Sequence, residues 1–266
     1  MDFKEKIEYA TNTHQSLLCI GIDPSIKRIK ELPGLDKDNP LFDFGRRIVE
    51  ECFDQACAFK LNIAFFEEAG YLGLKQLSDL ISLIKQEKLP VILDCKRGDI
   101  GSSSKAYANA AFKVYDADAV TLSPYMGSDS IKPFSDFTDR FSFVLCLTSN
   151  LGAQDFQIRF SWYRQVIEGI KDWMHEWERD NLGLVLGATK TDYIREVREA
   201  FDGYLLVPGV GEQGGNLKDI LKYGRNKSGY GLCINVSRSI IFASMDKDFP
   251  KNARRKAIEY RKMMLD

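Results

Sequence analysis

The sequence has few of the residues on which metal and disulfide chemistry usually depends. Its 266 residues include only two histidines, His14 and His175, and neither lies near cysteines or carboxylates with the spacing of a zinc site. Six cysteines are scattered without a Cys-x-x-Cys pair, and most lie in apolar runs, where cysteine behaves as a small buried side chain. We therefore expect reduced thiols, a cytoplasmic location, no metal site, and chemistry that uses other residue types.

Two further absences exclude classes of partner. With 37 basic and 38 acidic residues the formal net charge is -1, so no overall field attracts nucleic acid or an anionic membrane. No apolar run is long enough to span a bilayer, and the charged start Met1 to Lys6 leads into no signal-like apolar segment. Because 44% of the residues are hydrophobic, we expect a globular protein with a large core that binds neither nucleic acid nor membranes.

Short runs of β-forming residues alternate with amphipathic stretches of helical period along the whole chain. The runs predict eight strands: Leu17–Ile22, Ala58–Ile63, Val91–Lys96, Ala119–Leu122, Phe143–Leu147, Gly183–Gly187, Tyr204–Val207 and Gly231–Val236. The helical stretches between them include Tyr71–Glu87, Ser103–Tyr115, Ile158–Arg179, Asp192–Phe201 and Gly215–Tyr223. Eight such units predict an α/β fold, a single (β/α)8 TIM barrel over residues 1–266, with Ile26–Asn39 as a surface excursion.

Charged and polar residues gather at the ends of the first three predicted strands, where barrels of this kind carry their active sites. They are Asp23 after the first strand, Lys60 and Asn62 on the second, and Asp94, Lys96 and Asp99 at and after the third. Side chains two residues apart on a strand share a face, so Asp94 and Lys96 should face the barrel mouth within reach of Lys60. An internal salt-bridge network is the alternative, but the strand-end position favours a catalytic centre.

A second candidate site follows the last two strands. A glycine-rich loop runs from Pro208 to Gly215, and Arg238 follows the eighth strand. Barrels commonly bind phosphate at this place, where loop N–H groups and an arginine fork can hold an anion. Such a loop taken alone also fits an ordinary turn, and only its position in the barrel favours anion binding.

The segment Asp94-Cys95-Lys96-Arg97-Gly98-Asp99-Ile100-Gly101 resembles the signature of the orotidine 5'-phosphate decarboxylase family. Other segments resemble further motifs of the family in the expected order: Gly21 to Ser25, Phe59 to Asn62, Leu147 to Asn150, Pro208 to Gly214 and Asn235 to Arg238. The resemblance covers almost the whole chain, and the insertion after the first strand resembles the longer, type 2-like branch. It implies a cofactor-free decarboxylase that converts orotidine 5'-phosphate to UMP and CO2 in de novo pyrimidine biosynthesis.

The resemblance also implies roles at the reacting centre. Lys96 would protonate C6 of the pyrimidine, and Asp94 would lie beside the departing carboxylate. Lys60 and Asp23 would hold the ribose hydroxyls. Asp99 would act in the neighbouring subunit's site of a homodimer.

Further contacts to the substrate are implied by the same resemblance. They would come from Asn62, Ser103, Ser149, Pro208, Gln213 and Arg238, with Gln213 linking phosphate and base and its loop closing as a lid. Two departures from the family pattern put details in question. Ser103 stands where threonine is usual, which affects packing more than hydrogen bonding, and Leu151 replaces a proline, which bears on the rigidity of its loop.

Two other functions are compatible with the sequence. A magnesium-dependent sugar-phosphate decarboxylase or aldolase of the same barrel superfamily also carries a D-x-K-x-x-D pattern, but it would lose activity in EDTA. A non-catalytic barrel would bind a nucleoside monophosphate without turnover, since fold does not determine function.

Overall fold

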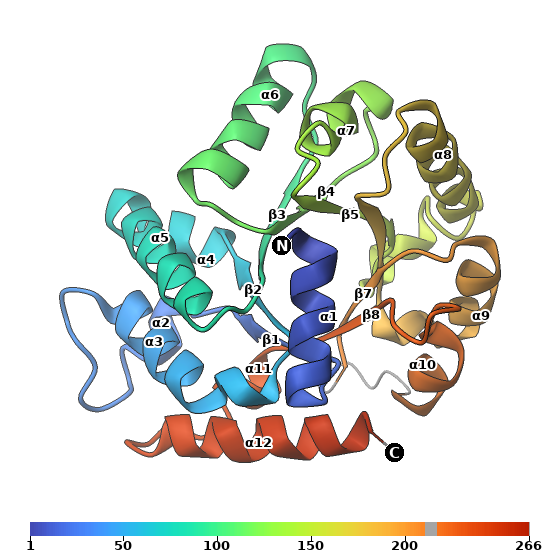
Figure 1. Cartoon of the computed structure of the whole chain (residues 1–266). Helices are drawn as coiled ribbons and strands as arrows, with labels where there is room; N and C mark the ends of the chain where they lie inside the picture. The colour runs from blue at the N-terminus through green and yellow to red at the C-terminus, as the bar shows by residue number, and fades with distance from the viewer. Residues whose placement is uncertain (211–216, 266) are drawn as a thin grey trace.

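The fold is a closed barrel of parallel strands. The computed structural model describes residues 1–210 and 217–265. Over these residues eight strands each pair in parallel with the next along the chain, and β8 pairs with β1 (Figure 1). The strands are β1 (Leu18–Ile22), β2 (Ala58–Asn62), β3 (Val91–Arg97), β4 (Ala119–Leu122), β5 (Phe141–Leu147), β6 (Leu182–Leu186), β7 (Leu205–Pro208) and β8 (Leu232–Val236). The predicted (β/α)8 TIM barrel is confirmed.

Helices surround the barrel on its outer face, except for α1, which covers one of its ends (Figure 1). They are α1 (Phe3–His14), α2 (Ile26–Ile29), α3 (Pro40–Cys52), α4 (Ala64–Glu67), α5 (Gly70–Gln86), α6 (Gly101–Asn109), α7 (Ser128–Ser135), α8 (Trp162–Glu176), α9 (Thr191–Ala200), α10 (Leu217–Gly224), α11 (Arg238–Ile241) and α12 (Phe249–Met263). The five predicted helices correspond to α5, α6, α8, α9 and α10. The prediction began α8 too early because Ser161, directly before it, has a left-handed backbone with φ of 51°. No helix in the described parts of the chain is long and apolar enough to cross a membrane.

Helix α1 lies across the N-terminal end of the barrel (Figure 1). Asp2 begins the helix by accepting the backbone N–H of Glu5, whose carboxylate in turn accepts the N–H of Asp2. Phe3 points into the barrel and stacks on Phe141, with ring centroids 4.9 Å apart. Apolar side chains from α1 and from the strands fill the interior of the barrel at this end.

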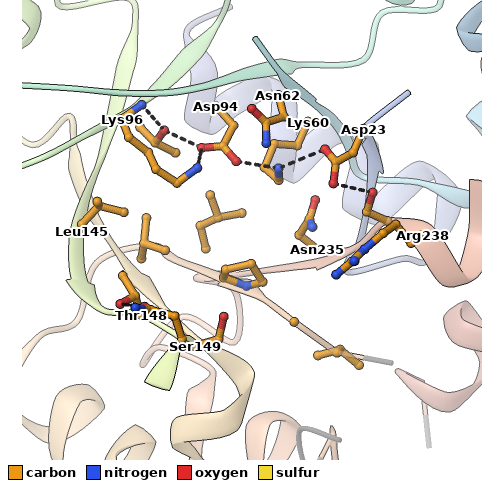
Figure 2. A pocket seen from close by; sticks show the side chains of 18 of the residues that line it. Asp23, Lys60, Asn62, Asp94, Lys96, Leu145, Thr148, Ser149, Asn235 and Arg238 are labelled. Carbon is orange, nitrogen blue, oxygen red and sulfur yellow. Dashed lines mark hydrogen bonds and ion pairs between the residues drawn. The ribbon is translucent and has the colours of Figure 1, made fainter. Parts of the chain in front are cut away.

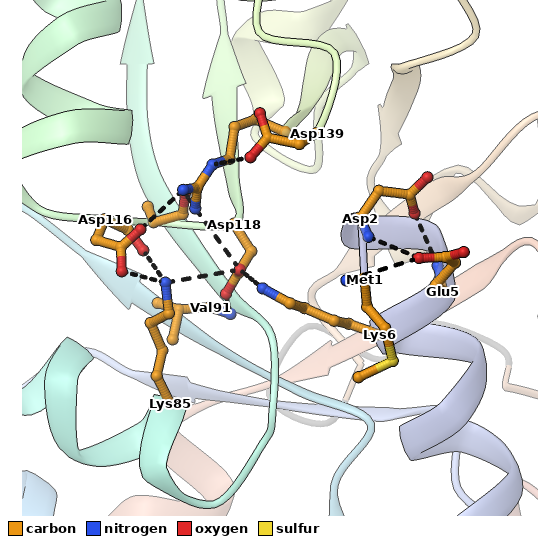
Figure 3. A network of polar contacts seen from close by, with 11 residues as sticks. Met1, Asp2, Glu5, Lys6, Lys85, Val91, Asp116, Asp118 and Asp139 are labelled. Carbon is orange, nitrogen blue, oxygen red and sulfur yellow. Dashed lines mark hydrogen bonds and ion pairs between the residues drawn. The ribbon is translucent and has the colours of Figure 1, made fainter.

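A buried carboxylate joins α1 to the strands at this end. Asp118, only 1% exposed, accepts the ammonium of Lys6 at 2.5 Å with Oδ1 and the backbone N–H of Val91 at 2.9 Å with Oδ2 (Figure 3). Lys85 and Arg140 lie 3.9 Å and 3.8 Å from the same Oδ1. A single side chain thus compensates several cations and links α1, α5, β3 and β4.

Replacing Asp118 with asparagine should destabilise the fold by about 2 to 3 kcal/mol. The neutral amide removes the carboxylate that Lys6 contacts, whereas Lys85 keeps Asp116 and Arg140 keeps Asp116 and Asp139. These remaining ion pairs and the partial exposure of Lys6 reduce the cost below that of a fully buried pair. Urea unfolding with a constant m value measures this. The control Asp79→Asn removes a carboxylate from the exposed Lys75–Asp79 pair and should cost about 0.5 kcal/mol or less. Equal losses in the two variants would contradict a special role for Asp118.

Candidate active site

A cavity of about 440 Å³ opens at the C-terminal ends of the strands. Its volume is within the usual range for small-molecule sites. Most of the predicted site residues line it: Asp23, Lys60, Asn62, Asp94, Lys96, Ser149, Pro208 and Arg238. Residues that are far apart in the sequence converge there because all eight strands run in the same direction.

Four charged side chains from neighbouring strands form a row along one wall of the cavity. Lys60 Nζ lies 2.8 Å from Asp94 Oδ2 and 4.0 Å from Asp23 Oδ1. Lys96 Nζ lies 2.5 Å from Asp94 Oδ1. Figure 2 shows this charged row (Lys96, Asp94, Lys60 and Asp23) on one side of the cavity, with Thr148 and Ser149 across from it. The predicted alternation of lysine and aspartate is therefore present.

Charge compensation keeps the central pair of the charged row ionised. Burial alone would raise the pKa of Asp94, but the ammonium groups of Lys60 and Lys96 hold it well below its ordinary value. Burial alone would lower the pKa of Lys60, but Asp94 and Asp23 raise it above its ordinary value. At neutral pH the cavity therefore presents a fixed carboxylate between two lysines.

The end of β3 departs from regular strand geometry at this site. Leu93 pairs with Val120 and Arg97 with Leu122, so three residues of β3 stand opposite Thr121 alone. Lys96 has a left-handed backbone with φ of 46°, a conformation that is unfavourable for a residue with a Cβ. Lys96 lies at the mouth, half exposed, and is held there by the surrounding contacts.

Asp23 lies where β1 pairs with β8 and closes the barrel, and a residue that follows β8 holds its side chain. Its Oδ2 accepts the hydroxyl of Ser237 at 2.7 Å. Its Oδ1 is buried and receives no hydrogen bond from the described residues, so it can accept one from a ligand hydroxyl. Gly21 permits this packing, because a Cβ there would lie 2.8 Å from that of Ser237.

The wall facing the charged row is the loop after β5. Gln157 Oε1 accepts the backbone N–H of Thr148 at 2.8 Å, and its Nε2 lies 2.9 Å from Thr148 Oγ1. Gly187 packs directly against Ser149, since a Cβ there would lie 2.6 Å from the Ser149 backbone nitrogen. Leu151, which replaces the expected proline, is 93% exposed. Side-chain contacts thus hold the start of this loop without a proline.

The far end of the cavity is formed by Pro208, at the end of β7, and by Arg238, the first residue of α11. Gly209 follows with φ of 97°, which glycine adopts without strain. Gln213, the predicted link between phosphate and base, falls in 211–216 and lies outside the described residues.

The model of the orotidine 5'-phosphate decarboxylase / HUMPS family matches residues 16–249. The chain belongs to this family. The orotidine 5'-phosphate decarboxylase of Christiangramia forsetii is 43% identical over 250 residues, covering 91% of this chain and 90% of that protein. The enzyme of the same name from Ralstonia pickettii is 43% identical over 267 residues, covering 98% and 97%.

The resemblance extends to solved structures of the orotidine 5'-phosphate decarboxylase family. The structure of Leishmania donovani OMP decarboxylase superposes with a TM-score of 0.83 at 35% identity, covering 100% of this chain and 99% of that one. The predicted type 2-like branch agrees with this neighbour. The segment that resembles the family signature, Asp94 to Gly101, supplies Asp94 and Lys96 of the charged row.

Two residues that the family resemblance assigned to the site are absent from the cavity lining among the described residues. Asp99 follows β3 and is partly exposed, and Ser103 lies exposed on α6. Other residues line the cavity to which the sequence analysis assigned no individual role. They are Thr121, Leu145, Thr148, Asn150, Val185, Leu206, Gly209, Val210, Asn235, Ser237 and Ser239.

Some of these residues had a signal in the sequence from which a role in the site could have been predicted. Asn235 and Ser237 are polar residues two positions apart at the end of an apolar strand, the pattern that identified Lys60 and Asn62. Thr121 had none, because threonine is common in strands. Within the described residues no cluster of three or more His, Cys, Asp or Glu is arranged to hold a metal ion.

Proposed function

We propose that the charged row performs the chemistry of this chain, a carboxy-lyase that converts orotidine 5'-phosphate to UMP and CO2 in pyrimidine biosynthesis. The observation that carries the proposal is the fixed Lys60–Asp94–Lys96 arrangement at the mouth of the cavity. Decarboxylation leaves an electron pair on C6, a vinylic carbon whose ring system does not delocalise it. The protein must therefore stabilise that charge through its own side chains.

Asp94 acts on the bound substrate before the bond breaks. Lysine charges keep Asp94 ionised, so a substrate carboxylate placed beside it meets another negative charge. At a separation of about 4 Å and an effective dielectric constant of about 20, the repulsion is roughly 4 kcal/mol. Departure of neutral CO2 removes this repulsion, which lowers the barrier relative to the bound substrate.

Lys96 acts as charge develops. Its ammonium, already 2.5 Å from Asp94, can lie against C6 and stabilise the growing carbanion. The C6 electron pair then takes a proton from Nζ, which gives UMP and a neutral amine that regains a proton from solvent. The interaction is strongest in the transition state, which is the requirement for catalysis.

The remaining contacts orient the substrate. Lys60 and the open Oδ1 of Asp23 hold the ribose hydroxyls. Ser149 bonds the pyrimidine edge, and Arg238 binds the phosphate as a planar donor fork. Asn62 and Pro208 complete the lining of the pocket, and the role proposed for Gln213 is to link the phosphate and the base. Phosphate binding remote from C6 contributes to the rate by fixing the reacting groups in place.

Asp99 and Ser103 belong, in this proposal, to the site of a second subunit in a homodimer. Support comes from their position outside their own chain's cavity lining and from large apolar side chains exposed nearby. Ile100 is 49% exposed and Tyr107 is 38% exposed. Each chain is then one catalytic domain over residues 1–266 that works in the cytoplasm and donates Asp99 to its partner.

Turnover of orotidine 5'-phosphate should continue at an unchanged rate in EDTA, because the charged row supplies the stabilisation that a metal would otherwise provide. The loss of substrate absorbance follows the reaction directly. Activity that disappears in EDTA and returns with Mg²⁺ would favour the metal-dependent sugar-phosphate chemistry. Binding of UMP without turnover of orotidine 5'-phosphate would favour a non-catalytic barrel.

A further inference from the structure

Thr121 connects the two catalytic side chains of the charged row through a single hydroxyl. Its Oγ1 donates a hydrogen bond to Asp94 Oδ1 at 2.8 Å and accepts the backbone N–H of Lys96 at 3.0 Å. A hydroxyl can do both at once, since it has one donor hydrogen and two acceptor lone pairs. Thr121 lies on β4, is 2% exposed, and lines the cavity.

The bulge in β3 explains why such a bridge is needed. Asp94 to Lys96 have only Thr121 opposite them, so the regular ladder cannot pair the Lys96 N–H. The Thr121 hydroxyl takes that N–H, and the Cys95 thiol lies 3.5 Å from the Thr121 carbonyl oxygen. The hydroxyl and the carbonyl of Thr121 therefore hold the bulge that gives Lys96 its left-handed backbone.

The same hydroxyl determines how the Asp94 carboxylate is turned. Lys60 bonds Oδ2, while Lys96 and Thr121 share Oδ1. Lysine side chains are flexible and can follow a rotating carboxylate, whereas the short β-branched side chain of Thr121 is fixed on its strand. Thr121 is thus the rigid member of the three donors around Asp94.

We propose that Thr121 is a positioning residue for decarboxylation. It holds the Asp94 carboxylate, which repels the substrate carboxylate, and the backbone of Lys96, the proton donor, in one fixed geometry. The inference rests on the proposed function of Asp94 and Lys96. Thr121 itself exchanges no proton with the substrate. A residue that only stabilised the fold would affect unfolding, whereas a positioning residue must affect kcat.

The test compares Thr121→Val, which keeps the shape but loses the hydroxyl, with Thr121→Ser, which keeps the hydroxyl. Thr121→Val should lower kcat by about 10- to 100-fold, the penalty of a reacting group displaced by about 1 Å. KM should change less than about threefold, because the contacts to phosphate and ribose come from other residues. Thr121→Ser should restore kcat to within about threefold of the parent enzyme.

Ser16→Ala is the matched control. Ser16 is also buried and bridging, since its hydroxyl donates to the Gln55 carbonyl at 2.7 Å and accepts the N–H of Leu18 at 3.1 Å, but it lies at the N-terminal end of the barrel. Its loss should lower the melting temperature and leave kcat unchanged. If Thr121→Val does not fold, Thr121→Ala against Thr121→Ser makes the same comparison.

Three results would overturn the inference: a kcat of Thr121→Val within about twofold of the parent, an effect confined to KM, or a Ser variant as slow as the variant without a hydroxyl. Failure of the proposed function is a separate outcome. In that case the parent protein itself would not turn over orotidine 5'-phosphate, whereas in these three it does.

Discussion

Replacing Lys96 with alanine should lower kcat for decarboxylation by at least about 10⁴-fold, because proton transfer and carbanion stabilisation are lost together. Among the described residues, no other side chain is arranged to donate the proton to C6. Lys60, the other ammonium of the charged row, is buried, lies 2.8 Å from Asp94 Oδ2 and 4.0 Å from Asp23 Oδ1, and is assigned to the ribose hydroxyls. The measurement is single-turnover loss of orotidine 5'-phosphate absorbance with enzyme in excess.

The binding of UMP separates loss of chemistry from loss of the site. Lys96→Ala leaves Asp23, Ser149 and Arg238 in place, so titration with UMP should give a dissociation constant within about tenfold of the parent value. Lys75→Ala is the control. It removes the lysine of the exposed Lys75–Asp79 ion pair on α5 and should retain full activity. Substantial turnover by Lys96→Ala would contradict the assignment of Lys96 as the proton donor.

The barrel and its charged row were predictable because their causes are local in sequence. Each strand carries its own β-forming run, and the i, i+2 spacing predicted that Asp94 and Lys96 share a face. The bulge in β3 also contributes to the placement of Lys96. Strand order then follows from the regular alternation of strand and helix. Lys60 reaches Asp94 because β2 and β3 are neighbours in register, with Asn62 opposite Asp94.

Features that depend on three-dimensional register were not predictable. The bulge that sets three residues of β3 against Thr121 arises from pairing between strands, and no residue type in the segment marks it. The same holds for the Ser237 contact to Asp23, which joins the two ends of the chain across the closing seam of the barrel. The packing of helix α1 on Phe141 also depends on residues far away in sequence, although its capping box of Asp2 and Glu5 is a local signal for the helix itself.

The assignment of Asp99 to the partner's site can be tested by mixing subunits. Lys96→Ala and Asp99→Ala homodimers should each be inactive, because every site in them lacks one required group. A heterodimer of the two variants should recover about half of the activity of the parent dimer, since the symmetry of a twofold interface leaves one of its two sites intact. Co-expression with two different affinity tags yields this heterodimer, and its kcat per dimer is the measurement.

The same design separates action across the interface from action within one chain. If Asp99 served its own chain's Lys96, the mixed dimer would contain two defective sites and would stay inactive. The control pairs Lys96→Ala with Asp94→Asn, whose side chains contact each other within one chain, so that heterodimer should show no recovery. A fully active Asp99→Ala homodimer would remove Asp99 from the site altogether. Recovery in the first pair and none in the second is the pattern that only a site shared between two subunits produces.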